Sequence, residues 1–184
     1  MKNMMFAAAL AAAVFVSGCA TTATRSVDVS WNDRDYDDVT MDITRKVLHH
    51  VAGKSKDRGR LPVIANGPII RTDHALNDID RELLLELIRA EVMRSGYAEF
   101  SFATSEFRRG GDSGMLFKLL EAQVDSDVFN PDTVKSYGKM TAADYILFGK
   151  IFLPEGTRTW RISFSVIDVE TGKGKWSDST RIAK

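Results

Sequence analysis

The sequence predicts an α+β domain in which helices pack on a single mixed sheet of about four to five strands. Two observations lead to this fold class. In residues 39–140, segments with apolar residues at helical intervals alternate with short apolar runs. In residues 143–183, three strand-like segments follow one another, separated by the turn-like stretches "PEGTR" and "ETGK". The chain has 184 residues, of which 44% are hydrophobic. This is enough to form the core of one domain but is short for two domains.

Four helices are expected. The first begins near Val39 and ends at Gly53, and the second is capped by Asn77 or Asp78 and stops at Gly96. The segment "SGMLFKLLEAQVD" forms a third, and a fourth starts at Asn130-Pro131, with proline at its favoured first position. The apolar faces of the first two consist of Val39, Ile43, Val47, Leu48 and Val51, and of Ile79, Leu83, Leu84, Leu87, Ile88 and Val92.

Five segments have the composition of strands. "LPVIANGPII" is a buried strand with a Gly-Pro break, and "YAEFSFA" alternates well enough for a second strand. "ADYILFGKIF", "TWRISFSVIDV" and "GKWSDSTRIA" form a C-terminal antiparallel meander. Because residues 145–148 are almost all apolar, the first strand of this meander should lie centrally with both faces covered.

The amino-terminal residues have the pattern of a secretory signal. Lys2 precedes an apolar stretch from Met4 to Val16, which is shorter than the roughly 20 residues needed to span a bilayer. Val16-Ser17-Gly18-Cys19 resembles the lipobox of bacterial lipoproteins, which implies cleavage before Cys19 and lipid attachment to it. A chance cysteine near an ordinary signal peptide is the alternative. The predicted organisation is therefore a signal peptide at 1–18, a lipidated cysteine with a short tether at 19–37, and a domain at 38–184.

The tether, "ATTATRSVDVSWNDRDYD" after Cys19, shows no helical period and has a typical coil span of about 25 Å. Trp31 and Tyr36 at its end either pack back onto the domain, which is the favoured interpretation, or bind a partner. The acidic residues of the tether are expected to be solvated and unsuited to catalysis. These are Asp33, Asp35, Asp37 and Asp38.

No catalytic constellation emerges from the sequence. His49 and His50 are adjacent on a helix and cannot easily share a metal, and no HExxH-type spacing involves them or His74. Ser113 in "GDSGM" is interpreted as a loop and helix start, without the histidine and aspartate pattern of a serine hydrolase. The glycine-containing basic loops match no phosphate-binding motif. The chain has 25 basic and 25 acidic residues, so it has no net positive charge to attract nucleic acid. The protein is therefore predicted to be no enzyme and to need no cofactor or metal.

Four segments together resemble the LpoB family, the outer-membrane lipoproteins that activate class A penicillin-binding proteins. They are "WND" at 31–33, "IIRTD" at 69–73, "ADYILFGKI" at 143–151 and "TGKGKWS" at 171–177. The resemblance spans the chain from about Trp31 onward and implies a fold like that of LpoB and of the TolB amino-terminal domain. It also implies a regulator of peptidoglycan synthesis on the periplasmic face of the outer membrane, with Ala20 after the cysteine consistent with that destination.

The same resemblance suggests where a partner docks. Lys135, Tyr137 and Lys139, with Phe148 on the adjoining strand, combine aromatic and basic side chains in a region that faces the partner in the family. The expected partner is a class A penicillin-binding protein. The family has a long proline-rich stretch after the lipidated cysteine, which is almost absent here. An assembly or structural lipoprotein of the outer membrane or of a secretion apparatus is therefore the alternative function, and a small-ligand binder is a third possibility.

Overall fold

The computed structural model describes residues 31–52, 59–71, 80–101, 111–126 and 128–184. Its centre is one five-stranded mixed sheet with the strand order β2-β1-β3-β4-β5. The strands are β1 (Val63–Arg71), β2 (Glu99–Ser101), β3 (Tyr145–Phe152), β4 (Thr159–Asp168) and β5 (Lys173–Ala183). β1 pairs in parallel with β2 and β3, whereas β3, β4 and β5 form the predicted antiparallel meander. The predicted fold class is confirmed.

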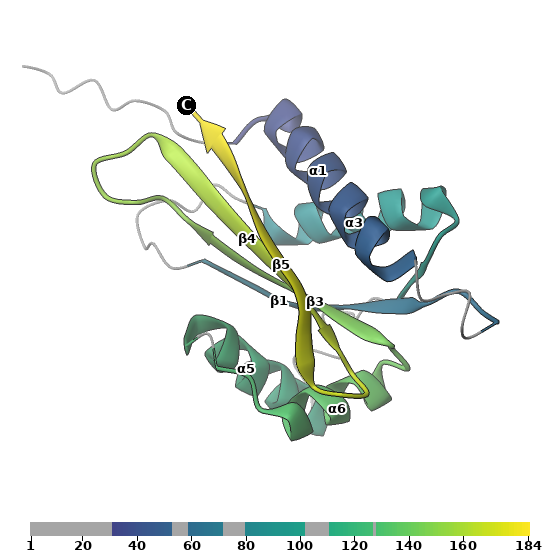
Figure 1. Ribbon diagram of the computed structural model, residues 1–184. Helices are drawn as coiled ribbons and strands as arrows, with labels where there is room; N and C mark the ends of the chain where they lie inside the picture. Colours follow the sequence, from purple (N-terminus) through teal and green to yellow (C-terminus); the bar gives the residue numbers. More distant parts are fainter. Residues whose placement is uncertain (1–30, 53–58, 72–79, 102–110, 127) are drawn as a thin grey trace, which may run out of the picture.

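Two helix pairs cover opposite faces of this sheet (Figure 1). One pair is α1 (Asp33–Ala52) and α3 (Arg81–Ser95), and the other is α5 (Gly111–Ser126) and α6 (Pro131–Met140). The α5 helix covers the predicted segment "SGMLFKLLEAQVD" but begins two residues earlier, at Gly111. The α6 helix begins with Asn130 as its N-cap and Pro131 in the first turn, as predicted. None of the described helices is long and apolar enough to cross a bilayer.

The central strand β3 supplies side chains to two separate cores. Tyr145, Leu147 and Ile151 pack in the core beneath α1 and α3. Ile146 and Phe148 point the other way, into the core beneath α5 and α6. Because successive strand residues face opposite sides, an apolar run is what a strand buried on both faces requires. The predicted central position of this strand is confirmed.

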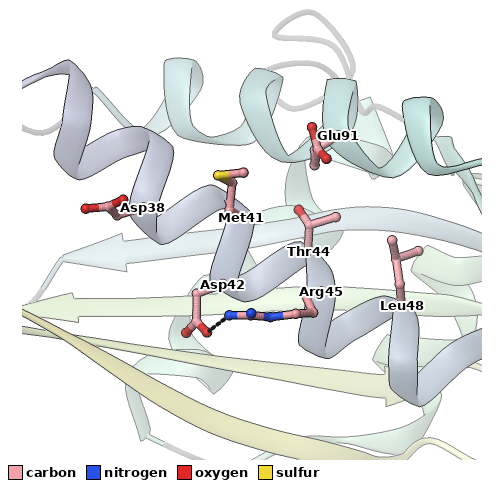
Figure 2. Close-up of a pocket in the computed structure, with 7 residues that line it drawn as sticks. All are labelled: Asp38, Met41, Asp42, Thr44, Arg45, Leu48 and Glu91. Atoms are coloured by element: carbon pink, nitrogen blue, oxygen red, sulfur yellow. Dashed lines mark hydrogen bonds and ion pairs between the residues drawn. The ribbon is translucent and has the colours of Figure 1, made fainter.

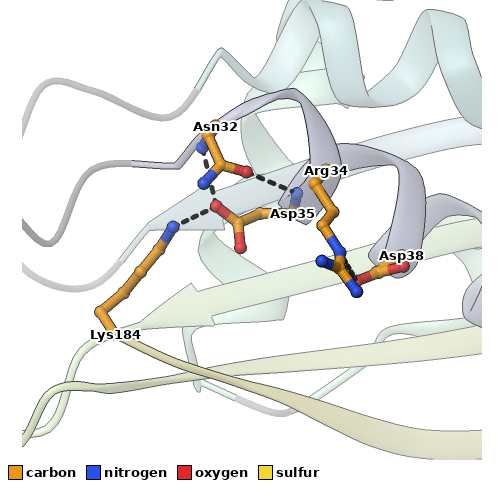
Figure 3. A network of polar contacts seen from close by, with 5 residues as sticks. All are labelled: Asn32, Arg34, Asp35, Asp38 and Lys184. Atoms are coloured by element: carbon orange, nitrogen blue, oxygen red, sulfur yellow. Dashed lines mark hydrogen bonds and ion pairs between the residues drawn. The ribbon is translucent and has the colours of Figure 1, made fainter.

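The first helix begins earlier than the sequence predicts. Asp35 N donates a hydrogen bond to Asn32 Oδ1 at 3.1 Å, and Asn32 N donates to Asp35 Oδ2 at 2.7 Å, which forms a capping box (Figure 3). Asp35 is also ion-paired with Lys184, at the end of the chain. Residues 31–37 are therefore part of the fold, not of the tether, and the expectation that Asp35 is a solvated tether acid is wrong.

Aromatic packing holds this helix start in place, as favoured from the sequence for Trp31 and Tyr36. The Trp31 ring lies edge-on to Tyr36 at 5.2 Å and to Trp160 of β4 at 6.2 Å between centroids. Tyr36 Oη accepts a hydrogen bond from Asp80 N at 2.7 Å. Asp80 is the N-cap of α3 and accepts from Glu82 N and Leu83 N, so the predicted cap at Asn77 or Asp78 is wrong. The predicted stop at Gly96 is confirmed by its φ of 68°.

An ion-pair triad ties the other side of α1 to the sheet edge. Lys46 Nζ lies 2.8 Å from Asp42 Oδ2 and 2.9 Å from Asp178 Oδ2 on β5. Hydrogen bonds to Asp42 and Asp178 raise the pKa of Lys46, and the bond from Lys46 lowers the pKa of Asp178. The ion pair of Asp178 therefore stabilises the folded state at pH values above the ordinary pKa of an aspartate. This stabilisation is lost as the pH falls through the lowered pKa of Asp178.

Gly138 allows α6 to approach the sheet closely. A Cβ on this residue would lie 2.3 Å from a methyl carbon of Val169. In an exposed helix, glycine to alanine would stabilise the protein by about 1 kcal/mol. Here we predict that Gly138→Ala lowers the free energy of unfolding by about 1–3 kcal/mol, because overpacking outweighs helix propensity.

Urea denaturation of Gly138→Ala and Gly174→Ala checks this prediction. An added Cβ on Gly174 in β5 meets no atom within 4 Å, so this control variant should be as stable as the wild type. A Gly138→Ala protein that matches the control would contradict the close approach of α6.

Candidate docking surface at one end of the sheet

Three parallel strands begin at the same end of the sheet. Glu99 N, at the start of β2, donates to Pro62 O before β1 at 2.9 Å, and Asp144 N before β3 donates to Val63 O at 2.8 Å. The segments that precede these strands therefore lie beside one another. They come from three distant parts of the sequence and bring with them the ends of α3 and α6.

Large apolar side chains are exposed on these segments. Leu61 precedes β1 and is 38% exposed, while Met93 at the end of α3 and Tyr97 before β2 are 52% and 63% exposed. Met140, the last residue of α6, is 44% exposed, and the neighbouring Lys139 is also exposed. We name Leu61, Met93, Tyr97, Lys139 and Met140 the far-end surface. Exposed apolar side chains brought to one end of a domain are typical of protein interaction sites.

A bidentate ion pair holds the centre of this end rigid. Arg60 Nη1 and Nη2 each lie 2.8 Å from one carboxylate oxygen of the buried Asp144. The same carboxylate accepts from Val63 N at 2.9 Å, and Arg60 also donates to Leu61 O at 3.1 Å. The hydrogen bonds to Asp144 raise the pKa of Arg60. The backbone of Leu61 is thereby held by the same arginine that pairs with Asp144.

The residues predicted for docking divide into two groups. Tyr137 is 0% exposed and donates its hydroxyl to Asn66 O at 2.7 Å, and Phe148 is 1% exposed in the same core. These two side chains do not reach the surface, so their predicted role as partner contacts is wrong. Lys135 is half-buried and Lys139 is exposed, one helical turn apart on α6. Their predicted role remains open, and Lys139 belongs to the far-end surface.

A second feature is a groove of about 490 Å³ between α1 and α3 (Figure 2). Glu91 on α3 faces Met41 and Thr44 of α1 across it. The acidic groups that line the groove are already ion-paired on their own helices. The pairs are Asp38 with Arg34, Asp42 with Arg45 and Glu91 with Arg94. Each described acidic residue that lines the groove is therefore already paired with an arginine.

The described residues hold no group of three or more metal-ligating side chains. Among the predicted positions, His49 is exposed and His50 half-buried at the end of α1. Glu86 and Arg89 form an exposed ion pair on α3 at 3.2 Å. Cys19 and His74 lie outside the described residues.

Comparison with known protein families gives one match over most of the chain. The sequence profile of the family described as "Peptidoglycan-synthase activator LpoB" matches residues 32–182. The chain belongs to the LpoB family. The matched range begins at Asn32, which caps α1, and ends within one residue of the end of β5. The resemblance inferred from the four sequence segments is thus confirmed.

Solved structures of similar fold include members of this family. The LpoB C-terminal domain from Salmonella enterica is 10% identical over 74% of this chain and 95% of that chain, with a TM-score of 0.44. Lipoprotein GNA1162 from Neisseria meningitidis is 13% identical over 67% and 81% of the two chains, with a TM-score of 0.42. A PelC dodecamer from Paraburkholderia phytofirmans is 17% identical over 67% and 72%, with a TM-score of 0.40. No curated protein sequence matches significantly.

Tyr137 on α6 is buried, whereas Tyr97, which follows α3, is exposed. The same substitution at both positions therefore tests which tyrosine stabilises the fold. Tyr137→Phe removes the buried hydrogen bond to Asn66 O, so we predict a loss of about 1 kcal/mol in the free energy of unfolding. Tyr97→Phe makes the same chemical change at an exposed site and should leave stability unchanged. Urea denaturation measures both, and equal effects would contradict the assignment.

Proposed function

We propose that this protein is an outer-membrane lipoprotein, anchored through Cys19, that binds a class A penicillin-binding protein and activates it. The observation that carries the proposal is membership of the peptidoglycan-synthase activator family across the whole folded part. The protein does no chemistry itself in this proposal. Its role is to hold a docking surface in the periplasm, where the synthase can reach it.

The far-end surface is the proposed docking site. The chain enters the fold at Trp31, which packs on Trp160 at the start of β4. β3 runs from the far end toward this point, because Phe152 at its end pairs with Arg161. The α1 helix starts beside Trp31 and runs the opposite way to β3, over 20 residues or about 30 Å, toward the far end. The far-end surface is therefore directed away from the anchor.

Tyr97 and Met140 are the proposed anchor residues for the partner. Both are large, exposed and attached to well-ordered helix ends, and tyrosine is enriched among residues that dominate binding energy. Lys139 beside Met140 supplies a positive charge that an acidic partner surface would complement. Lys135, one turn earlier on α6, extends this charge along the helix.

Affinity capture of the lipidated protein from cells tests the proposal. Wild type should recover a class A penicillin-binding protein, and addition to the purified synthase should raise its glycan polymerisation. Tyr97→Ala combined with Met140→Ala should weaken capture by about thirtyfold or more, the effect of losing one interface hot spot. Charge reversal at Lys135 and Lys139 should weaken it further.

Met41→Ala is the matched control, since Met41 is an exposed methionine on α1 and lies outside the far-end surface. This variant should retain capture and activation. Undiminished capture by the Tyr97 and Met140 double variant would exclude the far-end surface. Recovery of outer-membrane or secretion components without any synthase would contradict the proposed function.

The alternative function is assembly at the outer membrane. It is favoured by the early start of the fold, because only residues 20–30 separate Cys19 from Trp31. Fully extended, they reach at most about 40 Å. A synthase held at the inner membrane must therefore extend toward this protein, whereas an outer-membrane partner would already be close.

A further inference from the structure

One face of β4 and β5 is not covered by the described helices. Along β4, Trp160, Ile162 and Phe164 point into the core under α1 and α3. Arg161, Ser163 and Ser165 alternate with them and therefore point to the other face. On that face α5 and α6 pack on β1, β3 and the end of β4, at Ile167 and Val169. No described helix covers the first half of β4 and the paired half of β5 on this face.

Two arginines face each other in this area. Arg161 of β4 is the direct cross-strand partner of Arg181 of β5, and both are exposed. Like charges at directly opposite positions destabilise a sheet. Within the described residues, neither arginine forms an ion pair, and the Arg161 guanidinium instead lies 6.0 Å from the ring centroid of Phe152. An anion between the two guanidinium groups would remove this repulsion.

The other described residues of this area are polar, and none of them is acidic. Ser163 pairs with Ser179, and Ser165 with Ser177, whose hydroxyl oxygens lie 3.2 Å apart. The acidic residue of this part of β5, Asp178, points to the opposite face, where it pairs with Lys46. We name the area the arginine face. Its residues are Arg161, Ser163, Ser165, Ser177, Ser179 and Arg181.

The arginine face lies at the end of the domain where the chain enters the fold. Arg161 follows Trp160, which contacts Trp31, and Arg181 lies three positions before Lys184, which pairs with Asp35. As a coil, residues 20–30 span about 18 Å. An anchor at Cys19 would therefore hold this end of the domain close to lipid headgroups.

We propose that the arginine face binds the phosphate groups of anionic lipids in the membrane that carries the protein's own lipid anchor. This inference rests on the proposed anchoring at Cys19. Guanidinium groups bind phosphate oxygens through paired hydrogen bonds, and the serine hydroxyls can donate further ones. Contact at this face would restrict the orientation of the domain on the membrane.

Co-sedimentation of the unlipidated mature chain with vesicles tests the proposal. The chain carries Cys19→Ala, so that only the folded surface can bind. Vesicles of phosphatidylcholine mixed with phosphatidylglycerol should bind it, and phosphatidylcholine alone should not. Arg161→Gln combined with Arg181→Gln should weaken partitioning by about thirtyfold, from the usual contribution of a basic residue near an anionic bilayer. Raised salt should weaken wild-type binding similarly.

Lys135→Gln combined with Lys139→Gln is the matched control, because it removes the same charge from α6. It should leave vesicle binding unchanged. Thermal unfolding should show that the arginine double variant is at least as stable as wild type, since it removes a like-charge pair.

Three outcomes would overturn the inference: no preference for anionic vesicles, equal binding by the arginine variant, or equal loss in the lysine control. If the arginine variant kept vesicle binding but lost capture of the synthase, the face would belong to an acidic protein partner instead. The vesicle measurement contains no synthase, so its failure is distinct from failure of the proposed function.

Discussion

The rest of the structure depends on the burial of β3 on both faces. Tyr145 and Leu147 close one core, and Ile146 and Phe148 close the other, so both helix pairs are packed against one strand. Parallel pairing of β3 with β1 then brings the starts of the strands, and the ends of α3 and α6, to one end of the domain. β3 itself carries the chain to the opposite end, where β4 begins with Trp160 in contact with Trp31 and then runs back antiparallel to β3. The two ends of the domain are therefore set by one strand.

This arrangement separates two tasks. At one end, the capping box of α1, the aromatic contacts of Trp31 and the Lys184 ion pair fix the direction in which the chain leaves the fold toward Cys19. At the other, exposed apolar residues sit on a base held by the Arg60–Asp144 pair. The proposed activator role requires such a division, because a docking surface on an anchored protein would have to point away from the membrane. In the described residues, the sheet joins the two ends.

Apolar patterns in the sequence predict the fold class, the central strand and the meander, because local packing preserves these patterns. The family resemblance rests instead on four short segments and their order. Apolar patterns were not enough for the start of α1, since the signal there is a capping box and two aromatic residues instead of an apolar period. Tyr137 and Phe148 were assigned to the surface because residue type does not reveal which face of α6 and β3 they occupy. The far-end surface and the Arg161–Arg181 pair join residues distant in sequence, so they required the strand register.

Site-specific photo-crosslinking in cells tests the central claim most directly. A photoreactive amino acid is placed at Tyr97 in the far-end surface, and in a second protein at Met41, which is similarly exposed on α1. Our account predicts that the probe at position 97 crosslinks to a class A penicillin-binding protein and that the probe at position 41 does not. A crosslink to the synthase from position 41 alone, or from neither position while the synthase is still activated, would contradict it.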